Sequence, residues 1–181
     1  PIMLLVVLAT ILSVTPPTNV PVSSNGMGIN GIVCVNAVLS DKPVDLGCKH
    51  NIFTTTGQNM TRNLLSGWTS YTDIANITKI AVGNASTGAC GVTNTETTMT
   101  GEWQSCGLTR DFGTYSIQTT PPGSGNWTVA KTFTSSCNNV NVNCTAISNT
   151  TTAGSGLNFA IANFTNVQLQ TNDQITVTWY M

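Results

Sequence analysis

The stretch Asn126-Trp-Thr-Val-Ala-Lys-Thr-Phe-Thr-Ser135 decides the fold, because its apolar residues alternate with threonines. Trp127, Val129 and Phe133 fall on one face of an extended chain, and the threonines fall on the other. A period of two is typical of a β-strand that is buried on one face. The stretch Gln174-Ile-Thr-Val-Thr-Trp-Tyr180 repeats the pattern, so we expect two strands of the same kind.

Weaker alternation predicts strands elsewhere in the chain, at residues 32–39, 74–82, 112–119, 140–146 and 156–169. A helical turn is compatible with residues 59–65, but the sequence shows no long amphipathic helix. About seven or eight short strands separated by Gly- and Pro-rich turns predict an all-β fold, an antiparallel Ig-like β-sandwich. We expect one sandwich domain over residues 25–181, preceded by an apolar arm and linker over residues 1–24.

The composition excludes several classes of function. The 181 residues include six Lys and Arg and seven Asp and Glu, with a net charge of −1. This balance leaves no basic surface for a row of phosphates, so nucleic acid is not an expected partner. Thr, Asn and Ser are abundant and replace charge as the polar surface material. Because 40% of the residues are hydrophobic, the chain is expected to fold.

Six cysteines indicate disulfides rather than a zinc site, because their number is even and none forms a CxxC pair. They are Cys34, Cys48, Cys90, Cys106, Cys137 and Cys144. Six cysteines allow 15 pairings. The spacing favours three local bridges, which join 34 to 48, 90 to 106 and 137 to 144. Disulfides in turn indicate an extracellular protein.

Asn-x-Ser/Thr triplets give a second indication of secretion and predict N-linked glycans. They occur at Asn59, Asn76, Asn84, Asn126, Asn143, Asn149 and Asn163. A chain rich in Asn and Thr also produces such triplets by chance, and Asn143 is followed by a cysteine. Glycans would supply the solubility that the few charges do not.

The first 14 residues form an almost continuous apolar run that ends at Thr15-Pro16-Pro17. By hydropathy the run resembles a signal-peptide core, but no A-x-A site follows it. As a helix it would span about 21 Å, less than the roughly 30 Å of a bilayer core. As a strand it would reach about 46 Å. We expect assembly to be mediated by its large side chains, which are Ile2, Met3, Leu4, Leu5, Val6, Val7, Leu8, Ile11, Leu12 and Val14.

Three placements of this run remain open. The run could add as a strand to the sheet of a neighbouring molecule, or pack as a helix in a bundle of such tails. It could also be buried as a strand or helix in its own domain. The Pro16-Pro17 pair favours the neighbouring molecule, because it imposes an extended exit from the run. Head-to-tail contacts that do not close form filaments, so copies of the chain itself are the expected partner.

The residues that could carry chemistry are few. His50, two positions after Cys48, lacks the further ligands or the partner that a metal site or a nucleophile needs. Glu96 and Glu102 are a conceivable glycosidase pair, but we expect both at the surface. Asp45 and Asp173 are expected in turns. We therefore expect no enzyme, no metal and no cofactor.

Tryptophans offer a different function. Trp68, Trp103 and Trp127 could form a stacking platform for a sugar, which would make the chain a carbohydrate-binding or adhesive module. Their alternative role is to fill or cap the ends of the core. A monomeric adhesive surface glycoprotein therefore stays among the hypotheses.

Taken together, Ile2 to Val14, the Pro16-Pro17 linker, the seven sequons and the strand that ends at Trp179 resemble subunits of archaeal extracellular filaments, of the pilin and thread types. The resemblance implies a helical homopolymer for adhesion at the cell surface, with membrane contact only before assembly. The apolar run is too short for the long N-terminal helix of archaeal type IV pilins, which favours a donated strand. Thr72 to Gly83 also looks like segments of virion fibre or capsid-surface proteins, so a viral structural protein is the second interpretation.

Overall fold

The computed structural model describes residues 31–66, 77–84, 95, 98–99, 101–117, 126–153 and 156–181. These residues form ten strands and one helix, which confirms the all-β prediction. The elements in chain order are β1 (Ile32–Leu39), β2 (Lys42–His50), β3 (Ile52–Phe53), α1 (Thr55–Leu65), β4 (Lys79–Gly83), β5 (Asp111–Phe112), β6 (Thr114–Ile117), β7 (Trp127–Thr134), β8 (Val140–Ser148), β9 (Asn158–Leu169) and β10 (Gln174–Tyr180). The predicted boundary of the arm at residue 24 lies outside the described residues.

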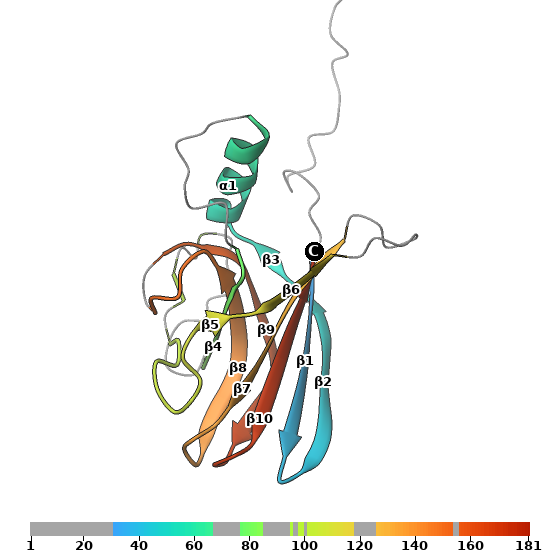
Figure 1. Ribbon diagram of the computed structural model, residues 1–181, viewed down its shortest axis with the longest axis vertical. Helices are drawn as coiled ribbons and strands as arrows, with labels where there is room; N and C mark the ends of the chain where they lie inside the picture. The colour runs from blue at the N-terminus through green and yellow to red at the C-terminus, as the bar shows by residue number, and fades with distance from the viewer. Residues whose placement is uncertain are drawn as a thin grey trace, which may run out of the picture.

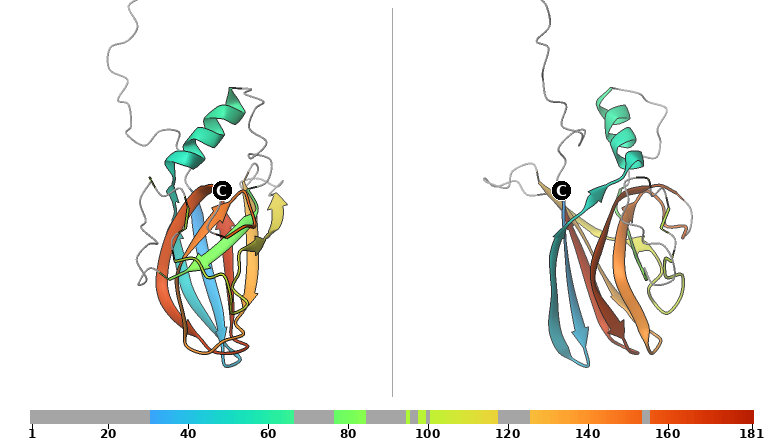
Figure 2. Two further views of the ribbon diagram at one scale, coloured as in Figure 1. Left: turned by 90° about the vertical axis from the view of Figure 1, so that its left-hand side faces the viewer. Right: turned by 180° about the vertical axis from the view of Figure 1, so that it is seen from behind.

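The described strands form two five-stranded sheets. The sheets pack face to face, as Figures 1 and 2 show. One sheet has the order β2-β1-β10-β7-β6, and the other has the order β3-β9-β8-β4-β5. Every pair of neighbouring strands is antiparallel. The predicted antiparallel β-sandwich is therefore confirmed.

The core between the sheets follows the alternation in the sequence. Ile175, Val177 and Trp179 on β10 are each 0% exposed, as the threonine alternation predicts. Val129 and Phe133 on β7 are buried beside them, and β7 pairs with β10 residue by residue. Burying these apolar faces against the other sheet supplies the main stabilisation of the fold, about 1.5–3 kcal/mol for each large side chain.

The strand predicted at residues 112–119 is confirmed over Thr114–Ile117, but Phe112 belongs to a separate strand, because the chain changes sheets between them. Asp111 and Phe112 pair with β4 in one sheet, whereas Thr114 to Ile117 pair with β7 in the other. Gly113 makes the crossing between them, and a Cβ at this position would lie 2.4 Å from Val129 Cγ1. Only a residue without a side chain fits this passage between the sheets.

β2 and β3 were not expected from the sequence. β2 carries Pro43, Gly47 and four charged or titratable residues, so its apolar alternation is weak. Its pairing with β1 shifts between Cys34 and Asn36, and Gly47 has a φ of 84°. Tertiary pairing with β1 therefore overrides a poor local pattern.

The helix α1 extends the turn expected near residues 59–65. Thr54 is its N-cap, and the Thr54 side chain accepts a hydrogen bond from Gly57 N at 2.9 Å. A Cβ at Gly57 would lie 2.1 Å from the carbonyl oxygen of Phe159, so the helix rests directly on β9. Met60, three residues after Gly57 on the helix, is buried in the main core.

The outer face of the second sheet is also covered. Ala81, Met99, Cys144, Ala146 and Ile161 form a small apolar cluster separate from the main core. The chain at residues 101–103 lies along β4 through a bridge between Gly83 and Glu102. All five residues of β4 are therefore buried, and half-exposed alternation is absent from this strand.

Candidate assembly surface

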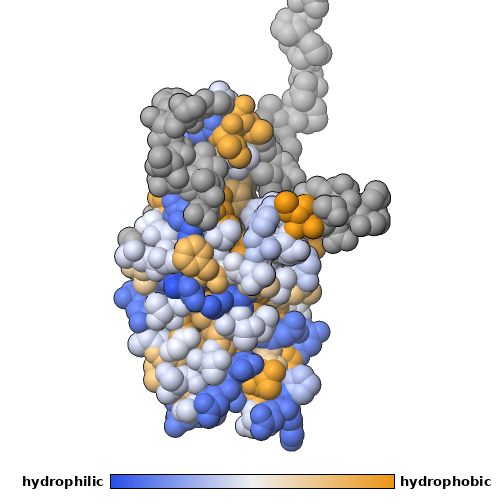
Figure 3. All heavy atoms as spheres, in the orientation of Figure 1, coloured by the Kyte–Doolittle hydropathy of each residue, from blue (hydrophilic) through white to orange (hydrophobic). Residues whose placement is uncertain are grey.

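The ten residues predicted to mediate assembly, from Ile2 to Val14, lie outside the described residues. The described residues show which apolar surfaces of the sandwich such a run could contact. Large apolar side chains that are exposed on the sandwich are Ile32, Val38, Leu64, Leu65, Phe112, Tyr115, Ile117 and Tyr180. Figure 3 shows apolar surface over α1 and over the region of β5 and β6.

Three of these side chains lie within six residues of one another on β5 and β6. Phe112, Tyr115 and Ile117 are 55%, 50% and 54% exposed. Trp127 on β7 is half-buried opposite Ile117, and its ring centroid is 5.9 Å from that of Tyr115. We call these four residues the β6 strip.

The strand pairing explains why the β6 strip is exposed. Tyr115 is opposite Val129, and Ile117 is opposite Trp127, so all four side chains point to the same face of the sheet. Val129 is 0% exposed because the other sheet covers it. The edge strand of that sheet, β5, is only two residues long, so its cover ends before it reaches Tyr115 and Ile117.

The charges next to the β6 strip are engaged at its β5 end. Lys131 Nζ donates a hydrogen bond to Asp111 Oδ2. This bond, with a second from the Phe112 backbone N–H, holds the pKa of Asp111 below its usual value. Lys79 Nζ lies 4.7 Å from the centroid of the Phe112 ring, and burial lowers the pKa of Lys79. β6 itself carries no charged side chain.

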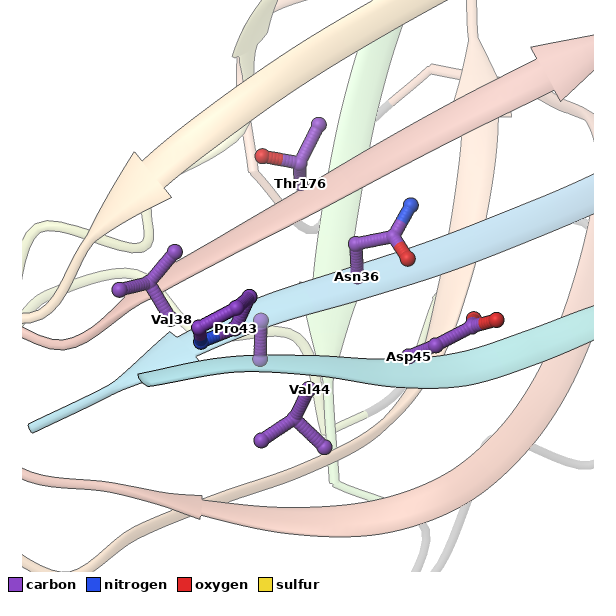
Figure 4. A pocket seen from close by; sticks show the side chains of 7 residues that line it. Asn36, Val38, Pro43, Val44, Asp45 and Thr176 are labelled. Carbon is purple, nitrogen blue, oxygen red and sulfur yellow. The ribbon is translucent and has the colours of Figure 1, made fainter. Parts of the chain in front are cut away.

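A shallow hollow of about 330 Å³ lies elsewhere, where β1 and β2 meet. Figure 4 shows its lining residues, which come from β1, β2 and β10. Asp45 is the sole carboxylate in this lining, and its Oδ1 accepts a hydrogen bond from Gly47 N at 2.8 Å. A single carboxylate that already accepts a backbone hydrogen bond does not form an acid–base pair.

Glu102 is not a surface residue, so the expectation for it was wrong. Its carboxylate accepts two hydrogen bonds from Arg110, from Nε at 2.8 Å and from Nη2 at 2.7 Å. The two side chains are 1% and 0% exposed. Arg110 Nη1 also donates to Ser148 Oγ at 2.7 Å. Because its oxygens are committed to an arginine and shielded from solvent, Glu102 serves as a structural residue.

The other chemical candidates are not brought together. His50 is exposed at the end of β2, and Glu96 lies outside the described residues. In the described part of the chain, no three His, Cys, Asp or Glu residues cluster closely enough to hold a metal ion. Asp173 closes the turn before β10, because its carboxylate accepts hydrogen bonds from Ser40 N and Gln170 N. The prediction of a turn residue is confirmed there, but it is wrong for Asp45, which lies within β2 opposite Asn36.

The three tryptophans of the proposed platform differ in environment. Trp103 packs against the core, and its Nε1 donates to the carbonyl of Asn141 at 2.9 Å. Trp127 belongs to the β6 strip, and Trp68 lies outside the described residues. Trp103 therefore caps the core, which was the alternative to a role in the platform.

The disulfides correct part of the predicted pairing. Cys34 is bonded to Cys48, as predicted. Cys106 is bonded to Cys137, so both predicted pairs that use these cysteines are wrong. Cys144 is also disulfide-bonded, and Cys90 lies outside the described residues. Spacing failed here because the chain from residue 101 to 110 returns to the β7–β8 turn, where Ser136 N donates to the Cys106 carbonyl. These bonds indicate a non-reducing environment.

The sequons differ in accessibility. Asn126 is exposed immediately before β7, whereas Asn84 is only 7% exposed. Asn59, Asn143, Asn149 and Asn163 are half-buried, and Asn76 lies outside the described residues. Since a glycan must join the side-chain amide in solvent, Asn126 is the most accessible acceptor among the described sequons.

Comparisons with protein-family models, curated proteins and solved structures found no match. Across the described part of the chain, the one helix is too short to cross a membrane.

Proposed function

We propose that this protein is the repeating subunit of a glycosylated extracellular filament. In this filament, residues 2–14 of each copy are buried against the next copy. Such a contact is head-to-tail, so it propagates into a polymer when it does not close into a ring. The resemblance to archaeal filament subunits points to adhesion at a cell surface as the purpose of the polymer.

The observation that carries the proposal is the presence of two complementary apolar surfaces in one chain. The first 14 residues contain no charged side chain, and the β6 strip exposes Phe112, Tyr115 and Ile117 by half or more. Each surface is unfavourable in water and is stabilised when the other covers it. The disulfides and the exposed sequon at Asn126 support an extracellular setting.

Negative-stain electron microscopy of the full chain beside a chain that starts at Thr18 tests the proposal. We expect filaments from the full chain alone. The point variant Val7→Asp should also prevent assembly, because it buries an unpaired charge in each contact. Val20→Asp is the matched control, because it places the same charge in the linker. Filaments from the Thr18 chain or from Val7→Asp would refute the proposal.

The aromatic rings of the β6 strip favour a second candidate, a monomeric adhesive glycoprotein that stacks sugars on Tyr115 and Trp127. This function predicts that oligosaccharides protect Trp127 from quenching by acrylamide in a full chain that stays monomeric. Unchanged quenching across a panel of neutral oligosaccharides would exclude it.

A further inference from the structure

In the part of the chain that the structure describes, the two sheets end in four edge strands, and three of them are poor templates for a further strand. β2 carries Lys42, Pro43, Asp45 and Lys49 in nine residues, and its pairing with β1 is interrupted. Charges, proline and bulges are the features that keep an edge strand from pairing with another chain. The β2 edge is therefore protected.

The edge strands of the other sheet are short. β3 and β5 are two residues long, which offers too few backbone groups for a stable ladder. β5 also contains Asp111, whose carboxylate is held by Lys131. Neither edge can hold a long apolar segment.

β6 is twice as long as β3 or β5, and it lacks the charges, the proline and the bulge that protect the other edges. Its four residues, Thr-Tyr-Ser-Ile from 114 to 117, include no charge and no proline. All four are exposed, and among the described strands β6 pairs with β7 alone. In Figure 2 β6, drawn in yellow, lies at the margin of the sandwich. The backbone groups on its free side and the apolar side chains of Tyr115 and Ile117 occupy the same edge.

We infer that β6 is the acceptor for the apolar run of a second copy. Part of residues 2–14 adds as a strand to the free edge of β6, and its alternate side chains pack beside Tyr115 and Ile117. The inference rests on the proposed function, because it names the partner surface of the same contact. Main-chain hydrogen bonds supply binding, and the apolar side chains supply the fit.

The position of the chain entry supports a second copy as the source of the strand. Ile32 is opposite Tyr180, Tyr180 is opposite Thr128, and Ile117 is opposite the adjacent Trp127. The chain thus enters the sandwich at the end of the sheet where β6 stops, about 14 Å away across three strand spacings. If the run of the same molecule paired antiparallel with β6, it would start at this end and finish at the opposite end of the sheet. The linker would then have to return along the whole sheet to reach Ile32.

The length and composition of the linker fit the contact with a neighbour instead. Residues 15–30 can extend over roughly 53 Å, whereas the 12 residues of β9, the longest described strand, extend about 40 Å. The prolines at 16, 17 and 21 favour an extended backbone over a return. The linker can therefore carry the run past its own sandwich to the next one.

Charge substitutions in β6 of the full chain test the acceptor. Ile117→Lys and Tyr115→Lys each place a positive charge on the β6 edge, which disfavours pairing with a further strand. Both should raise the concentration needed for polymerisation at least about tenfold, measured by sedimentation and electron microscopy. Val38→Lys is the matched control, because Val38 is also exposed, at 37%, but lies on β1 between two partner strands. It should polymerise like the unmodified chain.

Mixing two defective variants makes the test specific. Val7→Asp has a damaged apolar run and an intact β6. Ile117→Lys has a damaged β6 and an intact apolar run. Each alone should be monomeric, and an equimolar mixture should form one-to-one dimers by analytical ultracentrifugation. Dimer formation also shows that the sandwich of Val7→Asp, which supplies β6, is folded.

The outcomes separate the inference from the proposed function. Filaments from Ile117→Lys and Tyr115→Lys at the unmodified concentration would overturn β6 as the acceptor and leave the filament subunit intact. Two monomeric variants that do not combine would also overturn the acceptor, because the run would then bind elsewhere or within its own molecule. An unmodified chain that never polymerises would overturn both.

Discussion

Breaking the ion pair between Glu102 and Arg110 should destabilise the sandwich more than any surface change. The guanidinium donates two hydrogen bonds to the carboxylate at 2.7 and 2.8 Å, and both side chains are shielded from solvent. A third bond joins Arg110 to Ser148 on β8, so the pair anchors the 101–110 segment to the second sheet. Either residue left alone would be a buried charge that has lost its oppositely charged partner.

The size of the effect follows from this burial. Removal of one partner of a buried pair costs about 3–5 kcal/mol, whereas replacing both by apolar residues is often close to neutral. We therefore expect Glu102→Leu and Arg110→Met each to lose about 3–5 kcal/mol of unfolding free energy. The double variant should lose much less than either, because no charge remains. Ser148 Oγ keeps a partner there, the Thr150 carbonyl at 3.3 Å.

The assay is equilibrium urea unfolding of the full chain, followed by tryptophan fluorescence. The exposed pair of Asp111 and Lys131 is the control, and Asp111→Asn should cost only about 0.2–1 kcal/mol, because the Asp111 side chain is 52% exposed. A loss below about 1 kcal/mol for Glu102→Leu, or a double variant as unstable as the sum of both, would refute the burial argument.

Three further changes have defined outcomes. Replacing Cys106 and Cys137 by serine opens a loop with a sequence separation of 31 and should cost about 3–4 kcal/mol in the same urea assay. Ile175→Ala empties a site that is 0% exposed and should cost about 2–5 kcal/mol, and a loss under about 1 kcal/mol would contradict its place in the core. The lowered pKa of Asp111 predicts a stabilising contribution that is complete above its ordinary value of 3.8 and is lost as the pH falls through the lowered pKa. Urea midpoints between pH 5 and 2 should therefore fall less steeply in Asp111→Asn, and identical slopes would contradict the contact.

Most of the fold could be predicted from the sequence wherever one face of a strand is buried and the other is solvated. β7 and β10 follow their threonine alternation, and in β1 the buried Val33, Val35 and Ala37 alternate with more exposed residues, because the physical cause of the pattern is the burial itself. β4 is buried on both faces, so its sequence alternates poorly and its first residue could not be located. β2 was missed because its edge position tolerates proline and charge.

The features that sequence reasoning could not predict depend on contacts between distant segments. Cys106 and Cys137 meet because residues 101–110 pack against the β7–β8 turn, and local spacing contains no trace of that return. The burial of Glu102 has the same cause, because its partner Arg110 belongs to the same segment. A signal was nevertheless present: in a chain with 13 charged residues, an acidic and a basic residue eight positions apart are candidates for a pair.

The β6 strip shows the same limit at the functional surface. An alternating pattern such as Thr-Tyr-Ser-Ile predicts that Tyr115 and Ile117 are buried, because alternation normally marks a core face. The pattern predicts the correct face of the sheet, because Tyr115 and Ile117 point to the same face as Val129, which the other sheet buries. The cover is missing because Gly113 moves the chain between sheets and leaves β5 two residues long. If the apolar run of a neighbour supplies that cover, the pattern describes the polymer rather than the isolated subunit. The exposure of Tyr115 to solvent should then fall on assembly, and equal hydrogen exchange of the β6 backbone in monomer and filament would contradict this reading.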